Sequence, residues 1–244
     1  MAGWVLQPAH AGLEAAFGSL DAVFALQGQR ITSDPLSEVI RVEFGGVRYY
    51  VKRYWAAGKG LRRYFGRPRI KAEWQNLRHF AAWGIPTAEI VAYGLERRAG
   101  AFVRGALITR ELVGTEDLGH IAGHQRERLA DSAWVARISA QLARGARALH
   151  DHHFAHNDLK WRNLLVNEAG DLFFIDCPTG SFWWGPLLRY RIDKDLACLD
   201  KVASQVLSRS QRLRFFLQYL GRERLSAADK HQARRILKFF EGRE

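Results

Sequence analysis

Cysteines and uninterrupted apolar segments are both scarce in this chain. Only Cys177 and Cys198 occur among 244 residues, and their spacing supports neither a disulfide framework nor a zinc site. The apolar stretch at residues 11–26 is broken by two acids and a glycine, and no basic segment or cleavage site accompanies it. These absences argue against a disulfide-rich secreted protein and against a membrane-spanning one. We therefore expect a cytoplasmic protein.

Acidic residues are also few. The chain has 25 Asp and Glu but 37 Lys and Arg, which gives a net charge of +12. Such an excess indicates an acidic partner, which could be nucleic acid, an anionic membrane or a phosphorylated substrate, or it is only a basic surface. Residues 59–71 hold six of the cations and no acid. This basic stretch could bind phosphates, lie at the periphery of an anionic inner membrane, or be a solvated loop. No base-reading module accompanies it, so nucleic acid is not favoured.

Strand patterns fill the first half of the chain. Alternating apolar residues predict strands at 23–31, 39–44 and 48–54, with Gly45-Gly46 as the turn between the last two. Apolar residues at helical spacing predict one main helix at 70–83, and two further strands are expected at 87–93 and 102–112. An antiparallel sheet with one helix is therefore expected.

The second half is predicted to be mainly helical. Apolar residues mark one face of a long helix at 135–149, and further helices are expected at 193–207, 210–220 and 226–240. A chain of 244 residues can form two small lobes. We expect an α+β fold whose boundary lies at Val113-Gly114-Thr115, giving domains 1–113 and 114–244. Nothing in the sequence indicates an oligomeric state.

The residues with the clearest chemistry lie between positions 156 and 176. The loop His156-Asn157-Asp158-Leu159-Lys160-Trp161-Arg162-Asn163 precedes the apolar residues 164–166 and then Ile175-Asp176. An aspartate and an asparagine on one loop, with a second aspartate at the end of a short strand, can converge on one nucleotide. Asp158 could accept a proton from a substrate hydroxyl, and Lys160 could neutralise charge on the transferred phosphoryl group. Asn163 and Asp176 could hold Mg²⁺.

Upstream segments fit the same chemistry. Lys52 lies on a predicted strand, where it could grip the phosphates of ATP, and Glu73 lies on the predicted helix, where an ion pair could position that lysine. Glu111 and Val113 end the last predicted strand, and their backbone groups could hydrogen-bond an adenine edge. His156 is expected to have a structural role and to bond backbone groups beneath the loop, because Asp158 already fills the role of base.

At these residues the chain resembles the lipopolysaccharide kinase family, the bacterial heptose and Kdo kinases with their InaA-like relatives, which share the protein-kinase fold. The resemblance runs from about residue 31 to residue 199 and rests on Val51-Lys52-Arg53, Gly66-Arg67-Pro68, Ala72-Glu73-Trp74, Gly84-Ile85-Pro86-Thr87, the 156–163 loop and Ile175-Asp176-Cys177-Pro178. It implies a bilobal kinase-like fold, with ATP and Mg²⁺ as cosubstrates. It also implies a lipopolysaccharide core glycolipid as acceptor, phosphorylated on a heptose or Kdo hydroxyl at the cytoplasmic side.

Departures from protein kinases favour a non-protein acceptor. No Gly-x-Gly-x-x-Gly precedes Lys52, and residues 32–37 take its place, so their backbone and hydroxyl donors would have to cover the phosphates. Only seventeen positions separate Asp176 from Asp193, which leaves little room for a peptide-docking platform. The aromatic loop Phe182-Trp183-Trp184 in this segment could stack on a sugar, lie at an interface or pack in the core.

Two other functions stay open. The chain could be a protein or small-molecule kinase of the same fold, which product analysis with different acceptors would distinguish. It could also be a pseudokinase that binds nucleotide without chemistry. The presence of Lys52, Asp158, Asn163 and Asp176 argues against the pseudokinase.

Overall fold

The structure is a computed structural model that describes residues 3–56 and 66–242. The chain forms two compact units, one comprising Met1–His79 and Ala88–Leu112 and the other comprising Phe80–Thr87 and Val113–Glu244. The first unit contains an antiparallel sheet and the second is mostly helical, so the expected α+β class is confirmed. The division into domains 1–113 and 114–244 stays a prediction.

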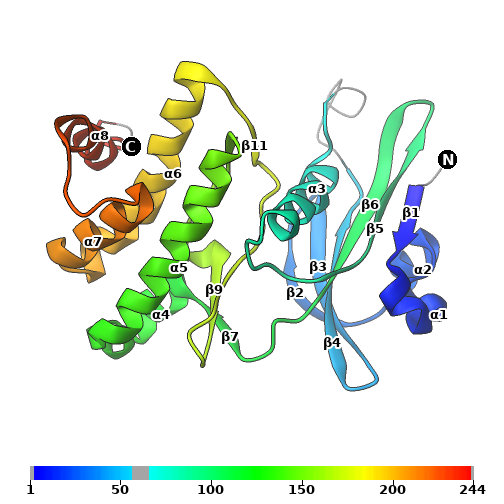
Figure 1. The fold of residues 1–244 in the computed structure, drawn as a ribbon. Coiled ribbons are helices and arrows are strands. Elements are labelled where there is room, and N and C mark those ends of the chain that lie inside the picture. The colour runs from blue at the N-terminus through cyan, green and yellow to red at the C-terminus, as the bar shows by residue number, and fades with distance from the viewer. Residues whose placement is uncertain (1–2, 57–65, 243–244) are drawn as a thin grey trace. The chain divides into compact units, whose positions relative to one another are not determined.

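The first unit is built on a six-stranded antiparallel sheet (Figure 1). Its strands, in order across the sheet, are β1 (Gly3–Leu6), β5 (Ile90–Arg98), β6 (Ala101–Arg110), β4 (Val47–Tyr54), β3 (Ser37–Phe44) and β2 (Gln29–Ser33). The expected hairpin between β3 and β4 turns at Gly45 and Gly46, which both have positive φ, because glycine enters that region without a Cβ clash. Helix α3 (Arg69–Ala82) confirms the main helix expected at 70–83.

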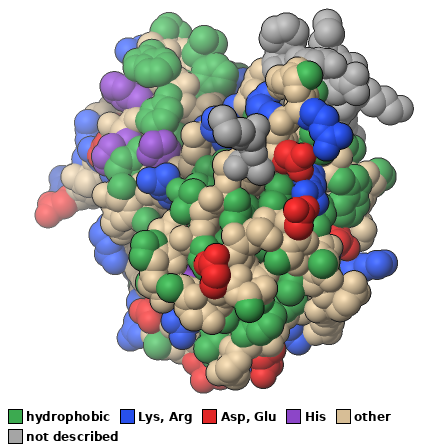
Figure 2. Space-filling model, turned by 90° about the vertical axis from the view of Figure 1, so that its right-hand side faces the viewer, with side chains coloured by type: hydrophobic (Ala, Val, Ile, Leu, Met, Phe, Trp, Pro, Cys, Tyr) green, Lys and Arg blue, Asp and Glu red, His purple; other side chains and the backbone are tan. Residues whose placement is uncertain are grey.

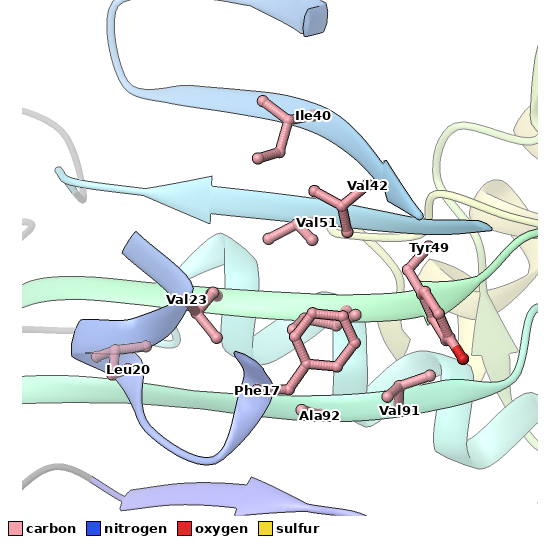
Figure 3. Close-up of a cluster of buried hydrophobic side chains, with 11 residues drawn as sticks. Phe17, Leu20, Val23, Ile40, Val42, Tyr49, Val51, Val91 and Ala92 are labelled. Atoms are coloured by element: carbon pink, nitrogen blue, oxygen red, sulfur yellow. The ribbon is translucent and has the colours of Figure 1, made fainter. Parts of the chain in front are cut away.

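One expected strand is a helix in its first part. The pattern at 23–31 predicts a strand, but α2 occupies Leu20–Ala25 after the short helices η1 (Pro8–Leu13) and α1 (Glu14–Phe17). Ser19 caps α2 by accepting a hydrogen bond from the Ala22 amide at 3.1 Å. Phe17, Leu20 and Val23 lie in a buried cluster with side chains of the sheet (Figure 3). The strand prediction is wrong here because helical residues supply this cluster.

The second unit contains helices and short strands. Its helical segments are α4 (Leu118–His124), η3 (Arg126–Ala130), α5 (Ser132–Asp151), η4 (Trp161–Asn163), α6 (Gly185–Val206), α7 (Arg209–Leu220) and α8 (Ala227–Leu237). One small sheet joins β10 (Leu172–Phe174), β9 (Leu164–Asn167) and β7 (Thr115–Asp117), and another joins β11 (Ser181–Phe182) and β8 (Phe154–Ala155). Helix α6 begins at Gly185, well before the predicted start at 193. Its first turns expose Leu187 and Tyr190, so the sequence lacks the apolar pattern that would predict a helix there.

The positive charge is distributed rather than gathered on the face that Figure 2 shows. Lys and Arg side chains lie there among acidic and hydrophobic ones. Within residues 3–56 and 66–242, no helix is both long and apolar enough to cross a membrane.

Candidate active site

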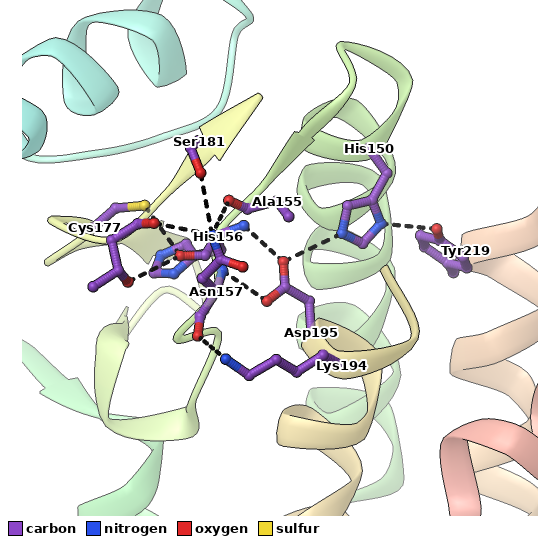
Figure 4. A network of polar contacts seen from close by, with 10 residues as sticks. His150, Ala155, His156, Asn157, Cys177, Ser181, Lys194, Asp195 and Tyr219 are labelled. Carbon is purple, nitrogen blue, oxygen red and sulfur yellow. Dashed lines mark hydrogen bonds and ion pairs between the residues drawn. The ribbon is translucent and has the colours of Figure 1, made fainter. Parts of the chain in front are cut away.

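A buried carboxylate from another element holds the predicted catalytic loop. Asp195 on α6 is fully buried, and its oxygens accept hydrogen bonds from the backbone amides of His156 at 2.7 Å and Asn157 at 2.8 Å (Figure 4). Hydrogen bonds to charged acceptors are the stronger ones, and a buried amide without an acceptor is costly. Asp195 therefore fixes the two residues that precede Asp158.

Asn157 adopts a backbone conformation that few residues tolerate. Its φ is +65°, in the left-handed region where asparagine is enriched among non-glycine residues. Lys194 Nζ donates to the Asn157 carbonyl oxygen at 2.9 Å (Figure 4). The Asn157 side-chain amide donates to the Thr179 carbonyl oxygen at 2.9 Å. These contacts stabilise the bend immediately before Asp158.

The predicted base Asp158 has two cations and an amide beside it. Lys160 Nζ lies 2.5 Å from Asp158 Oδ1, and a guanidinium nitrogen of Arg162 lies 3.9 Å from its Oδ2. Asn163 Nδ2 donates to the Asp158 carbonyl oxygen at 2.9 Å and to its carboxylate at 3.3 Å. Burial acts to raise the pKa of Asp158, but the hydrogen bond and charge of Lys160, with Asn163 and Arg162, hold that pKa below its usual value. Asp158 is therefore an ionised carboxylate at neutral pH.

The two predicted metal ligands flank one β-hairpin. Leu164 of β9 lies opposite Phe174 of β10, so Asn163 precedes the first strand and Asp176 follows the second at the same end. The Ile175 amide donates to the Asn163 carbonyl oxygen at 3.0 Å, which closes this end of the hairpin. The register thus brings the backbones of the two predicted ligands together.

The atoms of Asn163 and Asp176 suit a hard cation. Because Asn163 donates through Nδ2, its side-chain oxygen is the atom suited to a metal, and the Asp176 carboxylate adds a second oxygen ligand. No cluster of three or more His, Cys, Asp or Glu side chains suited to a metal occurs in the part of the chain that the structure describes. Mg²⁺ fits such a sparse oxygen set, because it usually takes its other ligands from phosphate and water.

His156 has a structural position, as the sequence predicts, but not through its ring nitrogens. The side chain is fully buried, and its ring centroid lies 5.9 Å from that of Phe80. Its backbone amide binds Asp195, whereas neither ring nitrogen has a hydrogen-bond partner. Burial lowers the pKa of His156 despite nearby carboxylates, so the ring stays neutral. The expectation that the imidazole bonds backbone groups is wrong.

Lys52 and Glu73 form the predicted ion pair within the first unit. Lys52 Nζ on β4 lies 2.9 Å from each carboxylate oxygen of Glu73 on α3. The Glu73 side chain is only 6% exposed, which reduces the screening of this pair by solvent. The ion pair therefore fixes the position of the lysine ammonium group.

The turn that replaces a glycine-rich loop binds its own aspartate. Asp34 Oδ1 accepts hydrogen bonds from the amides of Leu36 at 2.7 Å and Ser37 at 2.8 Å, and Ser37 Oγ donates to Oδ2 at 2.9 Å. These bonds, that from Leu36 foremost, hold the pKa of Asp34 below its usual value. The interpretation that residues 32–37 offer their donors to phosphates does not hold for Leu36 and Ser37 in this structure.

Glu111 makes contacts with both its backbone and its side chain. Its amide donates to the Arg48 carbonyl oxygen at 2.9 Å, and its carboxylate lies 2.8 Å from Arg48 Nε. An adenine contact by Glu111 would therefore have to use its carbonyl oxygen. Val113 is 73% exposed. The adenine contacts of both residues stay predictions.

Much of the predicted basic stretch lies outside the described residues, because positions 57–65 are not among them. Of its cations, Arg67, Arg69 and Lys71 are described. A guanidinium nitrogen of Arg67 donates to Asn76 Oδ1 at 3.3 Å. The membrane contact of this stretch stays a prediction.

The supporting residues of the loop were not found from the sequence. Asp195 and Lys194 bind the loop, and His150 links Asp195, at 3.5 Å, to the Tyr219 hydroxyl, at 2.8 Å (Figure 4). One signal was present: Asp195 lies four residues before Leu199, on the apolar face of the predicted helix. An acid at an apolar position indicates a buried partner.

Comparisons with known proteins agree on the fold and the activity. A family model described as "Lipopolysaccharide kinase (Kdo/WaaP) family" matches residues 19–232. Among solved structures, "WaaP in complex with acyl carrier protein" has a TM-score of 0.74 and 26% sequence identity, covering 98% of this chain and 100% of that chain. The protein-kinase-like fold expected from the sequence is therefore confirmed.

Proposed function

This chain belongs to the lipopolysaccharide kinase (Kdo/WaaP) family and is a kinase, and from that premise we propose that it transfers the γ-phosphoryl group of ATP to a heptose or Kdo hydroxyl of the lipopolysaccharide inner core. The observation that carries the proposal is the position of the Asp158 carboxylate beside Lys160 and Asn163. Family membership supports a lipopolysaccharide core acceptor. The proposal also includes ATP as the phosphoryl donor, heptose or Kdo as the sugar, and the cytoplasmic side of the membrane as the place of the reaction.

In this reaction Asp158 orients the acceptor hydroxyl and receives its proton as the phosphoryl group moves. An ionised carboxylate is the form of the group that can accept. Lys160 stabilises negative charge on the transferred group, since it already lies beside Asp158. Both residues are assigned as catalytic.

Asn163 and Asp176 are the residues that would hold Mg²⁺. When bound, the ion offsets the negative charge of the ATP phosphates. The Asn163 side-chain oxygen and the Asp176 carboxylate supply the protein's share of the ligands. The pairing of β9 with β10 keeps Asn163 and Asp176 at the same end of the hairpin.

Lys52 holds the ATP phosphates, and Glu73 positions Lys52 through their ion pair. The Glu111 carbonyl oxygen and the Val113 backbone bind the adenine. The basic stretch, residues 59–71, attracts the anionic inner membrane from the cytoplasmic side.

The test is transfer of labelled γ-phosphate from ATP to core lipopolysaccharide extracted from a strain lacking this gene. Asp158→Ala should reduce transfer by at least about 10²-fold, because both orientation and proton acceptance are lost. Binding of ATP should change little, since Asp158 acts on the acceptor. The matched control is Asp151→Ala, which removes an exposed carboxylate bound to Arg147 at the end of α5.

Each other outcome identifies a different function. Unchanged turnover of Asp158→Ala would show that Asp158 is not the base. Transfer to peptides or small molecules but not to core lipopolysaccharide would establish another kinase of the same fold. Nucleotide binding without transfer to any acceptor would establish a pseudokinase.

We also propose that this chain associates with acyl carrier protein, as WaaP does in the solved complex. The supporting observation is an apolar cavity of about 570 Å³ in the second unit, lined by residues that include Trp134, Leu142, Leu199, Phe216 and Ile236. An apolar cavity of this size suits an alkyl chain. Acylated carrier protein should raise the melting temperature more than the unacylated form, and Ala203→Trp, which would fill the cavity, should remove that difference. Equal shifts with both forms would contradict the acyl contact.

A further inference from the structure

An exposed aromatic surface occupies the start of α6. We name it the aromatic rim and define it as Phe182, Trp184, Leu187, Arg189 and Tyr190. Trp184 is 64% exposed, Leu187 60% and Tyr190 44%. Large apolar side chains exposed together on a short segment are unusual on a protein surface without a partner. The rim therefore has the character of a contact surface.

The segment that contains the aromatic rim has charges of only one sign. No acidic residue occurs between Asp176 and Asp193, whereas Arg189 and Arg191 lie in that interval. Neither arginine forms an ion pair with any acid in the described part of the chain. The partner of this surface should therefore be anionic as well as apolar.

Arg191 is held between aromatic rings instead of by a carboxylate. Its guanidinium carbon lies 4.5 Å from the ring centroid of Trp183 and 5.8 Å from that of Tyr190. Its Nε is buried and has no hydrogen-bond partner. The buried Nε cannot reach an external anion, but a guanidinium positioned by rings keeps its terminal nitrogens for an anion such as phosphate.

The aromatic rim is fixed on the elements that hold the catalytic loop. Phe182 of β11 lies opposite Phe154 of β8, the strand that leads directly into His156, and the Trp183 amide donates to the His153 carbonyl oxygen at 2.8 Å. Helix α6, which begins in the rim, also carries Lys194 and Asp195, and both of these bind the loop. The aromatic rim and the predicted base therefore belong to connected elements of the same unit.

We propose that the aromatic rim docks on the anionic surface of a lipid bilayer, with Trp184, Leu187 and Tyr190 entering the headgroup region and Arg189 and Arg191 contacting lipid phosphates. This inference rests on the proposed function, because a glycolipid acceptor is embedded in such a bilayer. Tryptophan and tyrosine favour the membrane interface, where one part of the ring is apolar and another part is hydrated. Docking of the rim would hold the protein at the membrane that contains the acceptor.

The first experiment measures binding without any acceptor. The full-length protein is sedimented with vesicles of phosphatidylethanolamine and phosphatidylglycerol that contain no lipopolysaccharide. Leu187→Ser should weaken binding about tenfold, the effect of losing one buried leucine. Its matched control is Ile31→Ser, a 46% exposed isoleucine on β2, which should bind as the wild type does.

The charge is tested in the same assay. Arg189→Glu should weaken binding about thirtyfold at low salt, because each charge near an anionic surface contributes on the order of 1 kcal/mol. Added salt should reduce this difference, since it screens such attraction. The control is Arg224→Glu, another exposed arginine, placed before α8. Wild-type binding by both rim variants would overturn the proposal.

The second experiment compares two acceptors, one embedded in vesicles and one made water-soluble by removal of its acyl chains. For the rim variants, the ratio of kcat/KM on the embedded acceptor to that on the soluble one should fall in parallel with vesicle binding. An unchanged ratio would also overturn the proposal. If the wild type phosphorylates neither acceptor, the proposed function fails, while the sedimentation result still decides the membrane contact.

Discussion

Two loops of this chain contain an aspartate and several backbone amides, and they satisfy those amides in opposite ways. In the turn between β2 and β3, Asp34 accepts the amides of Leu36 and Ser37 within its own turn. In the catalytic loop, the amides of His156 and Asn157 are bound by Asp195 from α6. The local aspartate of that loop, Asp158, contacts side chains instead.

The aspartate of the β2–β3 turn has a structural role, whereas in the predicted catalytic loop the remote Asp195 takes the structural role. A carboxylate that satisfies its own turn cannot also bind a substrate without leaving those amides exposed. When a remote carboxylate supports the loop, the local one keeps its oxygens for other partners. The predicted catalytic loop therefore leaves the Asp158 carboxylate to its side-chain partners, whereas in the β2–β3 turn the amides of Leu36 and Ser37 are already bound by Asp34.

Removal of Asp195 should have the largest effect. Asp195→Ala leaves two amides without a charged acceptor, which should cost about 3–5 kcal/mol of unfolding free energy. It should also lower activity by about 10²-fold, because a small displacement of the loop misplaces Asp158. Urea unfolding and specific activity of the folded fraction measure the two effects.

Asp193→Ala is the matched control for Asp195→Ala. Asp193 is also buried on α6, but it binds Arg235 at 2.7 Å and Gln232 at 3.0 Å on α8 rather than the loop. Its loss should reduce stability and leave specific activity near that of the wild type. Equal loss of specific activity in both variants would mean that Asp195 does not act through the loop.

The second-largest expected effect concerns Asn163 and Asp176, the predicted metal ligands. Asp176→Asn and Asn163→Ala should each raise the Mg²⁺ concentration for half-maximal activity by about tenfold or more, since each removes an oxygen ligand or its charge. Asp171→Asn is the control, because Asp171 lies at the opposite end of the β9–β10 hairpin. Identical magnesium titrations for all variants would exclude both residues as ligands.

A third effect follows from the neutral His156 beneath the loop. Its pKa is lowered in the folded chain, so below the ordinary value of 6.5 the unfolded chain takes up a proton that the folded chain does not. Stability should therefore fall as the pH drops below 6.5, by about 1.4 kcal/mol per pH unit from this residue. His156→Phe should flatten that slope in urea unfolding at pH 5 to 7, whereas replacing the exposed His231 by Phe should not. Equal slopes for the wild type and His156→Phe would contradict this account.

The smallest expected effect concerns the β2–β3 turn, whose amides are bound by its own Asp34. Asp34→Asn removes a negative charge from the turn expected to face the ATP phosphates, which should lower the KM for ATP about threefold. Glu43→Gln, on the exposed end of β3, should leave that KM unchanged. A higher KM for Asp34→Asn would mean that the closed turn itself supports nucleotide binding.

Local patterns allowed much of the architecture to be predicted. The β3–β4 hairpin and α3 follow from glycine turns and apolar spacing, which are properties of neighbouring residues. The Lys52–Glu73 pair was also predicted, because strand and helix order places a lysine and a glutamate in reach. The catalytic and metal roles stay predictions, since geometry alone does not test chemistry.

What could not be predicted depended on distant partners. The local pattern predicts a strand where part of α2 lies, because it does not reveal that the apolar residues of this helix pack against a sheet. Asp195 is bound to amides 38 and 39 residues away, so no motif spacing contains it. The hydrogen bonds of Asp34 are different, because they lie within one turn. An aspartate three residues before a serine is a local signal that can predict such bonds from the sequence.

The support of the catalytic loop by Asp195 has a consequence for the order of events during synthesis. Asp195 is added 39 residues after His156, which at ordinary elongation rates is a delay of roughly 2 to 8 seconds. Until it arrives, the loop amides have no charged acceptor and the left-handed bend at Asn157 lacks Lys194 as well. A nascent chain that has not yet reached α6 therefore carries every predicted catalytic residue but should not yet phosphorylate. Competence should arise in one step, when α6 folds onto the finished loop.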